Sequence, residues 1–154
     1  MATHVLEKTE TLSLWKFAVG GVIAGILAGI INNLFIVLFP FITPYQPVPG
    51  IDTMSVTIFS FLPVLAASLV YYGLYSMSPA KGTRNYIAMG ITILILSFYG
   101  PLFPNSIVAL IDTMNVDYTF ITNEGFAYFL IPLHIITAFM ALYVVPKFVT
   151  ASDT

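Results

Sequence analysis

Uncharged polar side chains occur inside four long apolar stretches of this 154-residue chain, and they are the residues best suited to bind a ligand. Counted along helices from the ends that lie away from the basic residues, six of these side chains fall in one half of a membrane. Four helices would then contribute to one polar layer, which either satisfies its own hydrogen bonds or lines a cavity. This predicted polar layer, our candidate ligand-binding set, comprises Asn32, Asn33, Ser60, Ser97, Tyr99 and His134.

Apart from tyrosine and from Lys16 at the edge of the first stretch, His134 is the only ionisable residue in these stretches. A histidine within a membrane can relay protons, bind haem, or hydrogen-bond a quinone or a lipid headgroup. The alternative is a neutral imidazole that bonds Asn33 or Ser97 and holds two helices together. The only other histidine, His4, lies in the N-terminal tail, so one chain does not supply two histidine ligands within the membrane. We expect no metal site and no cofactor.

Three prolines fall in the same half of the membrane as the polar layer. A proline inside a helix frees the carbonyl four residues earlier. Pro63 would free the carbonyl of Phe59. Pro101 would free that of Ser97, and Pro132 that of Tyr128. Freed carbonyls need partners in hydrocarbon, which adds to the polarity of this layer.

The usual catalytic signatures are missing. The sequence holds no HExxH, no nucleophile elbow, no Walker A motif and no cysteine. Its five Lys and Arg residues form no basic stripe, so a nucleic-acid partner has no support. These absences favour a non-enzymatic role.

The composition determines the class of protein. Hydrophobic residues make up 58% of the chain and charged residues 8%, against about 45–50% and 25% in soluble domains. A soluble chain of this length could not bury so much apolar surface. We therefore expect a single integral membrane domain, residues 1–154, in contact with the lipid bilayer.

Four stretches are long enough to cross the hydrocarbon core, which needs about 20 helical residues. Apart from Lys16 at the edge of the first, none of them contains Asp, Glu, Lys or Arg. Continuous rather than alternating hydrophobicity favours helices over barrel strands. The sequence thus predicts an all-α bundle of four transmembrane helices, at about residues 15–39, 56–75, 86–103 and 126–145.

The breaks between the spans are marked by Pro and Gly. Pro40 is expected to end the first helix, and Pro101 and Pro104 the third. Residues 76–82 predict a tight turn between the second and third spans. The remaining loop, residues 104–125, has apolar residues at helical spacing, which predicts a short helix on the membrane surface or a structured loop.

Basic residues give the orientation. On a four-span chain they all fall on one side, which the positive-inside rule makes cytoplasmic; they are Lys8, Lys16, Lys81, Arg84 and Lys147. The loops on the other side carry only acidic charges: Asp52, Asp112, Asp117 and Glu124. Both termini are therefore expected in the cytoplasm, with the protein in the cell membrane, as in a bacterial inner membrane.

Gly21, Gly25 and Gly29 form two overlapping GxxxG units in the first span. Glycines at this spacing let another helix approach closely. The partner helix could belong to the same chain, to a second copy in a homo-oligomer, or to another membrane protein.

A set of small motifs carries a resemblance: Asn33 at the end of a Gly/Ala-rich span, Val48-Pro49, Pro63, Ser97 with Pro101-Leu102, and Leu133-His134. In these the chain resembles an uncharacterised bacterial family of small four-span membrane proteins, a domain of unknown function. The resemblance implies the four-helix topology and directs attention to Asn33, Ser97 and His134. It implies no activity.

Taken together, these patterns favour a non-enzymatic membrane protein, either an accessory subunit or a binder of a small or lipid-like ligand in the polar layer. The alternative is a small transporter or channel. A third reading is a lipid-phase enzyme with His134 as its acid–base group.

Overall fold

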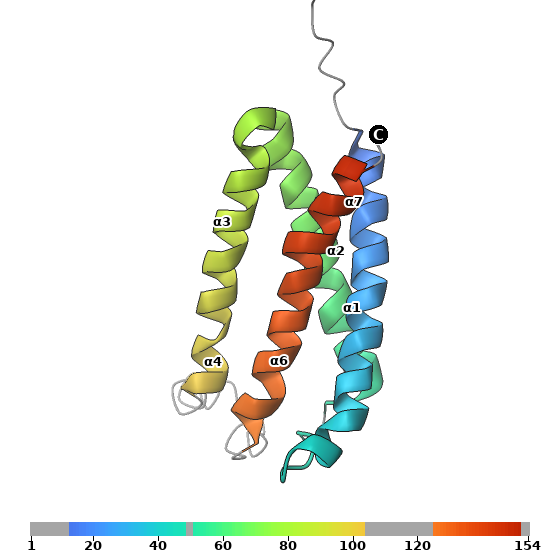
Figure 1. Cartoon of the computed structure of the whole chain (residues 1–154), viewed down its shortest axis with the longest axis vertical. Helices are drawn as coiled ribbons and strands as arrows, with labels where there is room; N and C mark the ends of the chain where they lie inside the picture. The colour runs from blue at the N-terminus through green and yellow to red at the C-terminus, as the bar shows by residue number, and fades with distance from the viewer. Residues whose placement is uncertain (1–12, 49–50, 104–124, 152–154) are drawn as a thin grey trace, which may run out of the picture.

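The computed structural model describes residues 13–48, 51–103 and 125–151. Within these ranges the chain forms helices and no strand, and four helical segments are long and apolar enough to cross a membrane, as predicted (Figure 1). The elements are α1 (Leu14–Ile42), α2 (Thr53–Met77), α3 (Pro79–Ser97), α4 (Tyr99–Leu102), α6 (Phe126–Phe139), the π-helix η1 (Met140–Val144) and α7 (Val145–Ala151). The third span joins α3 to α4, and the fourth joins α6, η1 and most of α7.

The predicted tight turn between the second and third spans is confirmed, and it is shorter than expected. Only Ser78 separates α2 from α3. Its N–H bonds to the Leu74 carbonyl, and its own carbonyl accepts from the N–H groups of Lys81 and Gly82. Pro79 begins α3 because the first helical position needs no N–H donor.

The prediction that Pro40 ends the first helix is wrong, because α1 continues to Ile42. A proline this near the end removes only the hydrogen bond that would go to the Ile36 carbonyl. The last turn is closed instead by Thr43, whose N–H and hydroxyl both donate to the Phe39 carbonyl, at 3.0 and 2.9 Å.

Helix α2 begins with a charged cap. The Asp52 carboxylate accepts a hydrogen bond from the Ser55 N–H at 2.7 Å. The hydrogen bonds from Ser55 hold the pKa of Asp52 below its ordinary value of 3.8. This cap starts α2 three residues before the predicted span.

The glycines of α1 lie against α2 of the same chain. A Cβ added to Gly25 would stand 2.8 Å from Phe61 Cδ2 and 3.1 Å from the Phe61 carbonyl oxygen, and one added to Gly21 would stand 2.7 Å from Ser68 Cβ. A side chain on these glycines would therefore force the two helices apart. The expected close approach is thus made within one chain.

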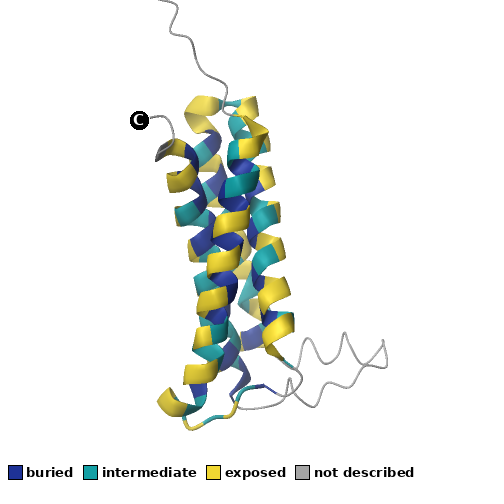
Figure 2. Cartoon of the chain, turned by 90° about the vertical axis from the view of Figure 1, so that its right-hand side faces the viewer, coloured by how far each residue is buried: buried dark blue, intermediate teal, exposed yellow. Residues whose placement is uncertain are grey.

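Buried residues follow the inner faces of the helices in two clusters, one toward each end of the bundle (Figure 2). In the cluster nearer the termini, Tyr71 and Tyr86 stack with ring centroids 4.5 Å apart. In the other cluster, Phe39 meets Phe129 edge to face at 5.1 Å.

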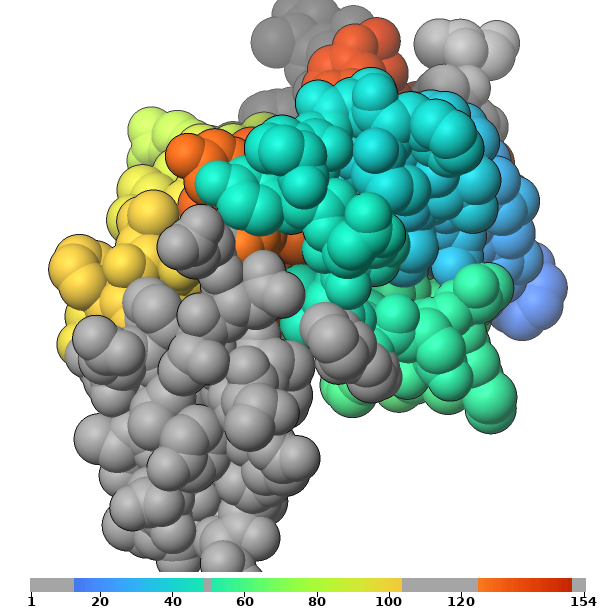
Figure 3. All heavy atoms as spheres, turned by 90° about the horizontal axis from the view of Figure 1, so that it is seen from below, coloured from blue at the N-terminus to red at the C-terminus, as the bar shows by residue number. Residues whose placement is uncertain are grey.

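At the end away from the termini, the segment that follows α1 lies across the start of α6 (Figure 3). There Tyr45 stacks on Tyr128 with ring centroids 5.3 Å apart. The surface helix predicted within 104–125 falls almost entirely on residues 104–124, which lie outside the described ranges.

Helix α3 is anchored near its beginning. Its buried residues are Gly82 and Tyr86, and the rest of the helix is partly or fully exposed. Tyr86 donates its hydroxyl hydrogen to the Ala141 carbonyl at 2.9 Å. Ala141 belongs to η1, in which the wider π turn shifts the backbone hydrogen-bonding pattern by one residue. Beyond this anchor, α3 leaves space between itself and the neighbouring helices.

Candidate functional site

A cavity of about 790 Å³ lies between α2, α3 and the α6–η1 segment, with Asn32 of α1 as part of its lining. We call it the α2–α3–α6 cavity. Its volume falls in the range of about 300–1,000 Å³ that is usual for ligand pockets. Its described walls are mostly apolar, and none of the described residues that line it is Asp, Glu, Lys or Arg.

The cavity is elongated along the bundle. On α2 its lining extends from Ser55 to Val70, a rise of roughly 22 Å at 1.5 Å per residue. On α3 it extends from Ser97 back to Tyr86. The cavity therefore covers much of the hydrocarbon core, which is about 30 Å thick.

The cavity is open along its side. Among the residues that line it, Phe59 is 75% exposed and Ile93 is 57% exposed. Both residues are on helices that bound the cavity, Phe59 on α2 and Ile93 on α3. In a bilayer such an opening meets acyl chains rather than water, so a ligand would enter from the lipid.

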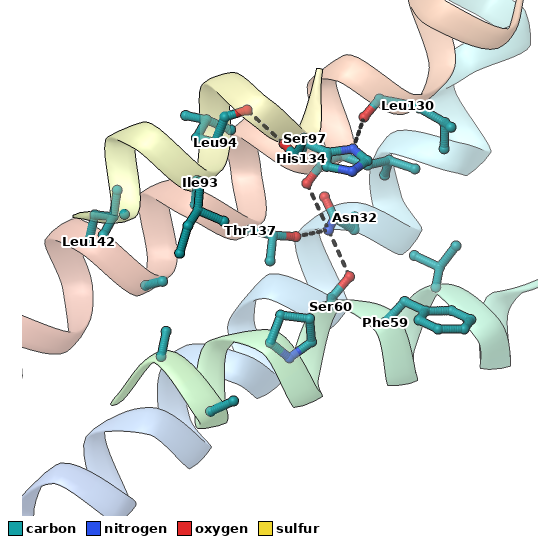
Figure 4. Close-up of a pocket in the computed structure, with 18 of the residues that line it drawn as sticks. Asn32, Phe59, Ser60, Ile93, Leu94, Ser97, Leu130, His134, Thr137 and Leu142 are labelled. Atoms are coloured by element: carbon teal, nitrogen blue, oxygen red, sulfur yellow. Dashed lines mark hydrogen bonds between the residues drawn. The ribbon is translucent and has the colours of Figure 1, made fainter. Parts of the chain in front are cut away.

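A polar cluster on three helices forms part of the lining (Figure 4). Asn32 is 1% exposed. Its Nδ2 donates to Ser60 Oγ on α2 at 2.8 Å and to Thr137 Oγ1 on α6 at 2.9 Å, and the Leu133 carbonyl lies 3.4 Å away. One amide group thus links α1, α2 and α6 at this depth.

The other half of the same amide has no partner. Among the described residues, no group donates a hydrogen bond to Asn32 Oδ1, although the atom is buried. The carbonyl of Leu133 can only accept, so it requires the nitrogen of Asn32 on its side and leaves the oxygen unpaired. An unsatisfied buried acceptor costs about 1–3 kcal/mol.

His134 forms its hydrogen bond within its own helix. Its Nδ1 lies 2.8 Å from the Leu130 carbonyl oxygen. Because a carbonyl only accepts, Nδ1 carries the hydrogen and Nε2 is left for the cavity that His134 lines. The expected bond to Asn33 or Ser97 is wrong: a carbonyl one turn back is always within reach, whereas α3 lies across the cavity.

Four residues of the predicted polar layer line the cavity: Asn32, Ser60, Ser97 and His134. Ser97 is engaged with its own helix, since its hydroxyl donates to the Leu94 carbonyl at 2.7 Å. That these residues bind a ligand stays a prediction.

The two other members of the layer lie elsewhere. Asn33 faces α2: its Nδ2 donates to the Gly29 carbonyl of its own helix and to Thr57 Oγ1 of α2, both at 2.8 Å. Tyr99 is 56% exposed, with its ring beside that of Phe103. Neighbouring helical residues point about 100° apart, so Asn32 and Asn33 cannot share one face.

The sequence reasoning missed Thr137, which completes the polar cluster. It follows His134 by three residues and Leu133 by four, so helical spacing places it on the same face. The hydroxyl group of Thr137 could have identified it. Because Thr137 lies one helical turn deeper in the membrane than His134, it was counted with the apolar half.

The chemistry available to this site is hydrogen bonding to a mostly apolar molecule. Within the described ranges, no three His, Cys, Asp or Glu side chains gather as metal ligands would. The part of the lining that the structure describes offers His134 no carboxylate as an acid–base partner, and the Tyr86 hydroxyl is bonded to a carbonyl. Comparison with protein families, with curated proteins and with solved structures found no match to this chain.

Proposed function

We propose that this protein binds a lipid-like ligand within the membrane, in the α2–α3–α6 cavity, without transforming it. The observation that carries the proposal is the distribution of polarity along this cavity. The cluster around Asn32 lies in the part nearer Ser55, whereas the part toward Tyr86 is lined by aliphatic side chains such as Val70 and Met89. This arrangement is complementary to an amphiphile, with its head at Asn32 and its tail toward Tyr86.

The shape favours a single chain. A crevice of roughly 22 Å along α2 accommodates one extended hydrocarbon tail, and the open side lets it enter laterally. A binding role needs no acid–base pair, and no carboxylate is found among the described lining residues.

The distribution of charge supports cytoplasmic termini. The beginning of α1, the α2–α3 turn and the end of α7 lie at one end of the bundle (Figure 1), and they carry Lys16, Lys81, Arg84 and Lys147. Asp52 lies at the start of α2, at the other end. Under the positive-inside rule the ligand head then occupies the outer half of the cell membrane.

Cysteine labelling tests this orientation on a chain that has no cysteine of its own. Gln46 and Ala80 are both exposed, at opposite ends of the bundle. In intact cells, Gln46→Cys should react with an impermeant thiol reagent, and Ala80→Cys should react only after permeabilisation. The reverse pattern would place the polar cluster in the cytoplasmic half.

Filling the cavity tests the proposed function. Ala138 lines it on α6, so Ala138→Phe should abolish the saturable rise in melting temperature that oleyl alcohol gives the wild type in detergent. Ala88→Phe is the control, because Ala88 is exposed on α3 and does not line the cavity. The proposal fails if no saturable rise occurs in the wild type, or if both variants retain it.

A further inference from the structure

The cavity presents two hydrogen-bond acceptors to which no described residue donates. The hydroxyls of Ser60 and Thr137 accept from Asn32 and keep hydrogens of their own. Asn32 Nδ2 donates to Ser60 and Thr137, His134 Nδ1 donates to the Leu130 carbonyl, and the Ser97 hydroxyl donates to the Leu94 carbonyl. What remains on the first two side chains is Asn32 Oδ1 and His134 Nε2, both acceptors in a neutral site.

The two acceptors are close neighbours in the fold. His134 directly follows Leu133, whose carbonyl oxygen lies 3.4 Å from Asn32 Nδ2. Both side chains line the same cavity, and Figure 4 shows the imidazole of His134 above the amide of Asn32. One ligand head at this place would meet both.

The lining also excludes charged heads. The lining residues that the structure describes include no Lys or Arg for a phosphate or carboxylate, and no Asp or Glu for an amine. Moving an ion into such a site without a partner costs far more than a hydrogen bond returns. The head must therefore be neutral.

Neutral heads that only accept hydrogen bonds are also disfavoured. An ester, an ether, a ketone or a quinone would bring its lone pairs against those of Asn32 Oδ1 and leave this buried oxygen unsatisfied. A hydroxyl supplies the missing hydrogen. Sites with unpaired polar groups discriminate strongly against ligands that lack the complementary group.

We propose that the cavity selects neutral single-chain alcohols, whose hydroxyl donates a hydrogen bond to Asn32 Oδ1. A head with a second hydroxyl also donates to His134 Nε2. This proposal rests on the proposed function, because it names the ligand class of the same cavity.

The test compares two probes that differ in the hydroxyl hydrogen. Oleyl alcohol and oleyl methyl ether share one chain, but only the alcohol can donate. Both are titrated at equal mole fractions in detergent micelles, and thermal unfolding gives the apparent affinity of each. We expect the alcohol to bind about three- to tenfold more tightly, as one net hydrogen bond allows.

Adjacent asparagines supply a matched pair of variants. Asn32→Leu should reduce the ratio of alcohol to ether affinity to about one. Asn33→Leu should leave the ratio unchanged, because Asn33 bonds to Gly29 and Thr57 and does not line the cavity. His134→Phe is a second test that leaves Asn32 intact. It should weaken the binding of 1-monooleoylglycerol, which has two hydroxyls, and leave the binding of oleyl alcohol unchanged.

The outcomes separate the two proposals. If alcohol and ether bind equally, and Ala138→Phe blocks both, the cavity binds lipids but the donor requirement is wrong. A wild-type protein that binds the ether more tightly also overturns it. If neither probe binds saturably, the proposed function itself fails.

Discussion

Asn32→Leu should leave the ligand-free protein as stable as the wild type or slightly more stable, although it removes a buried hydrogen-bonding side chain. The substitution nearly preserves volume, so little cavity or overpacking cost is expected. Its effect on the free energy of unfolding is then decided by two hydrogen-bonding terms of opposite sign.

The first term is a loss. Hydrogen bonds between helices in membranes contribute about 0.6 kcal/mol each on average, so the bonds to Ser60 and Thr137 together contribute about 1.2 kcal/mol. The second term is a gain, because the variant no longer buries the unpaired Oδ1, which costs about 1–3 kcal/mol. The balance lies between about zero and 2 kcal/mol in favour of the variant.

Thermal unfolding in detergent measures this balance, since each kcal/mol moves the Tm by about 2–4 °C for a chain of this size. Ser60→Ala is the control: it removes one of the two bonds and keeps Oδ1 unpaired, so it should lower stability by about 0.6 kcal/mol. A loss above about 2 kcal/mol for Asn32→Leu exceeds what two such bonds contribute and would contradict this balance.

Three further predictions concern the fold. Gly82→Ala should destabilise the protein by about 1–3 kcal/mol, because the new Cβ would stand 2.6 Å from the Tyr75 Cα. Gly73→Ala is the control: nothing lies within 4 Å of its Cβ, so the Tm should be unchanged or raised in the same thermal melts. Gly25→Leu should separate α1 from α2 and lower the Tm more than Gly73→Ala does, and an unchanged Tm would contradict the packing described. The hydrogen bonds that lower the pKa of Asp52 stabilise the α2 cap above pH 3.8, and this contribution should be lost as the pH falls through the lowered pKa. Asp52→Asn should therefore reduce the acid sensitivity of the Tm. Identical pH profiles of the Tm for wild type and variant would show that the Asp52 cap does not contribute to stability.

Much of the fold follows from the apolar composition of the stretches and from the prolines that interrupt them. Uninterrupted apolar stretches predict four spans because backbone groups in hydrocarbon must bond within a helix. Ser78-Pro79 gave a clear signal for the turn between α2 and α3, since proline starts a helix but cannot continue one. Pro40 misled because its effect depends on the distance to the end of the helix, which Thr43 decides through its bonds to Phe39.

The sequence predicted how deep in the membrane the site residues lie, but not which helix face each of them occupies. Residue counting places Asn32, Asn33, Ser60 and His134 in one layer, whereas the rotation of α1 against α2 decides which asparagine faces the cavity. That rotation follows from the fit of Gly21 and Gly25 onto α2, a tertiary contact that depth counting does not capture.

The cavity itself lay beyond the sequence pattern. It lies beside α3, whose buried residues, Gly82 and Tyr86, are both near its beginning. Nothing in the hydrophobicity of α3 distinguishes a side chain that faces this space from one that faces lipid, because both surroundings are apolar. The π-helix that receives the Tyr86 hydroxyl likewise has no sequence signature.

Photo-crosslinking tests most directly whether a lipid-like ligand occupies the α2–α3–α6 cavity. Oleyl alcohol with a diazirine near the end of its tail is bound to the purified protein, irradiated, and its adducts are mapped by mass spectrometry. We predict adducts on cavity residues toward Tyr86, such as Val70, Met89 and Leu142, suppressed by excess unlabelled alcohol and by Ala138→Phe. Adducts spread over the exposed face of α1, at Ile26, Ile30 and Val37, and insensitive to competition would contradict the account.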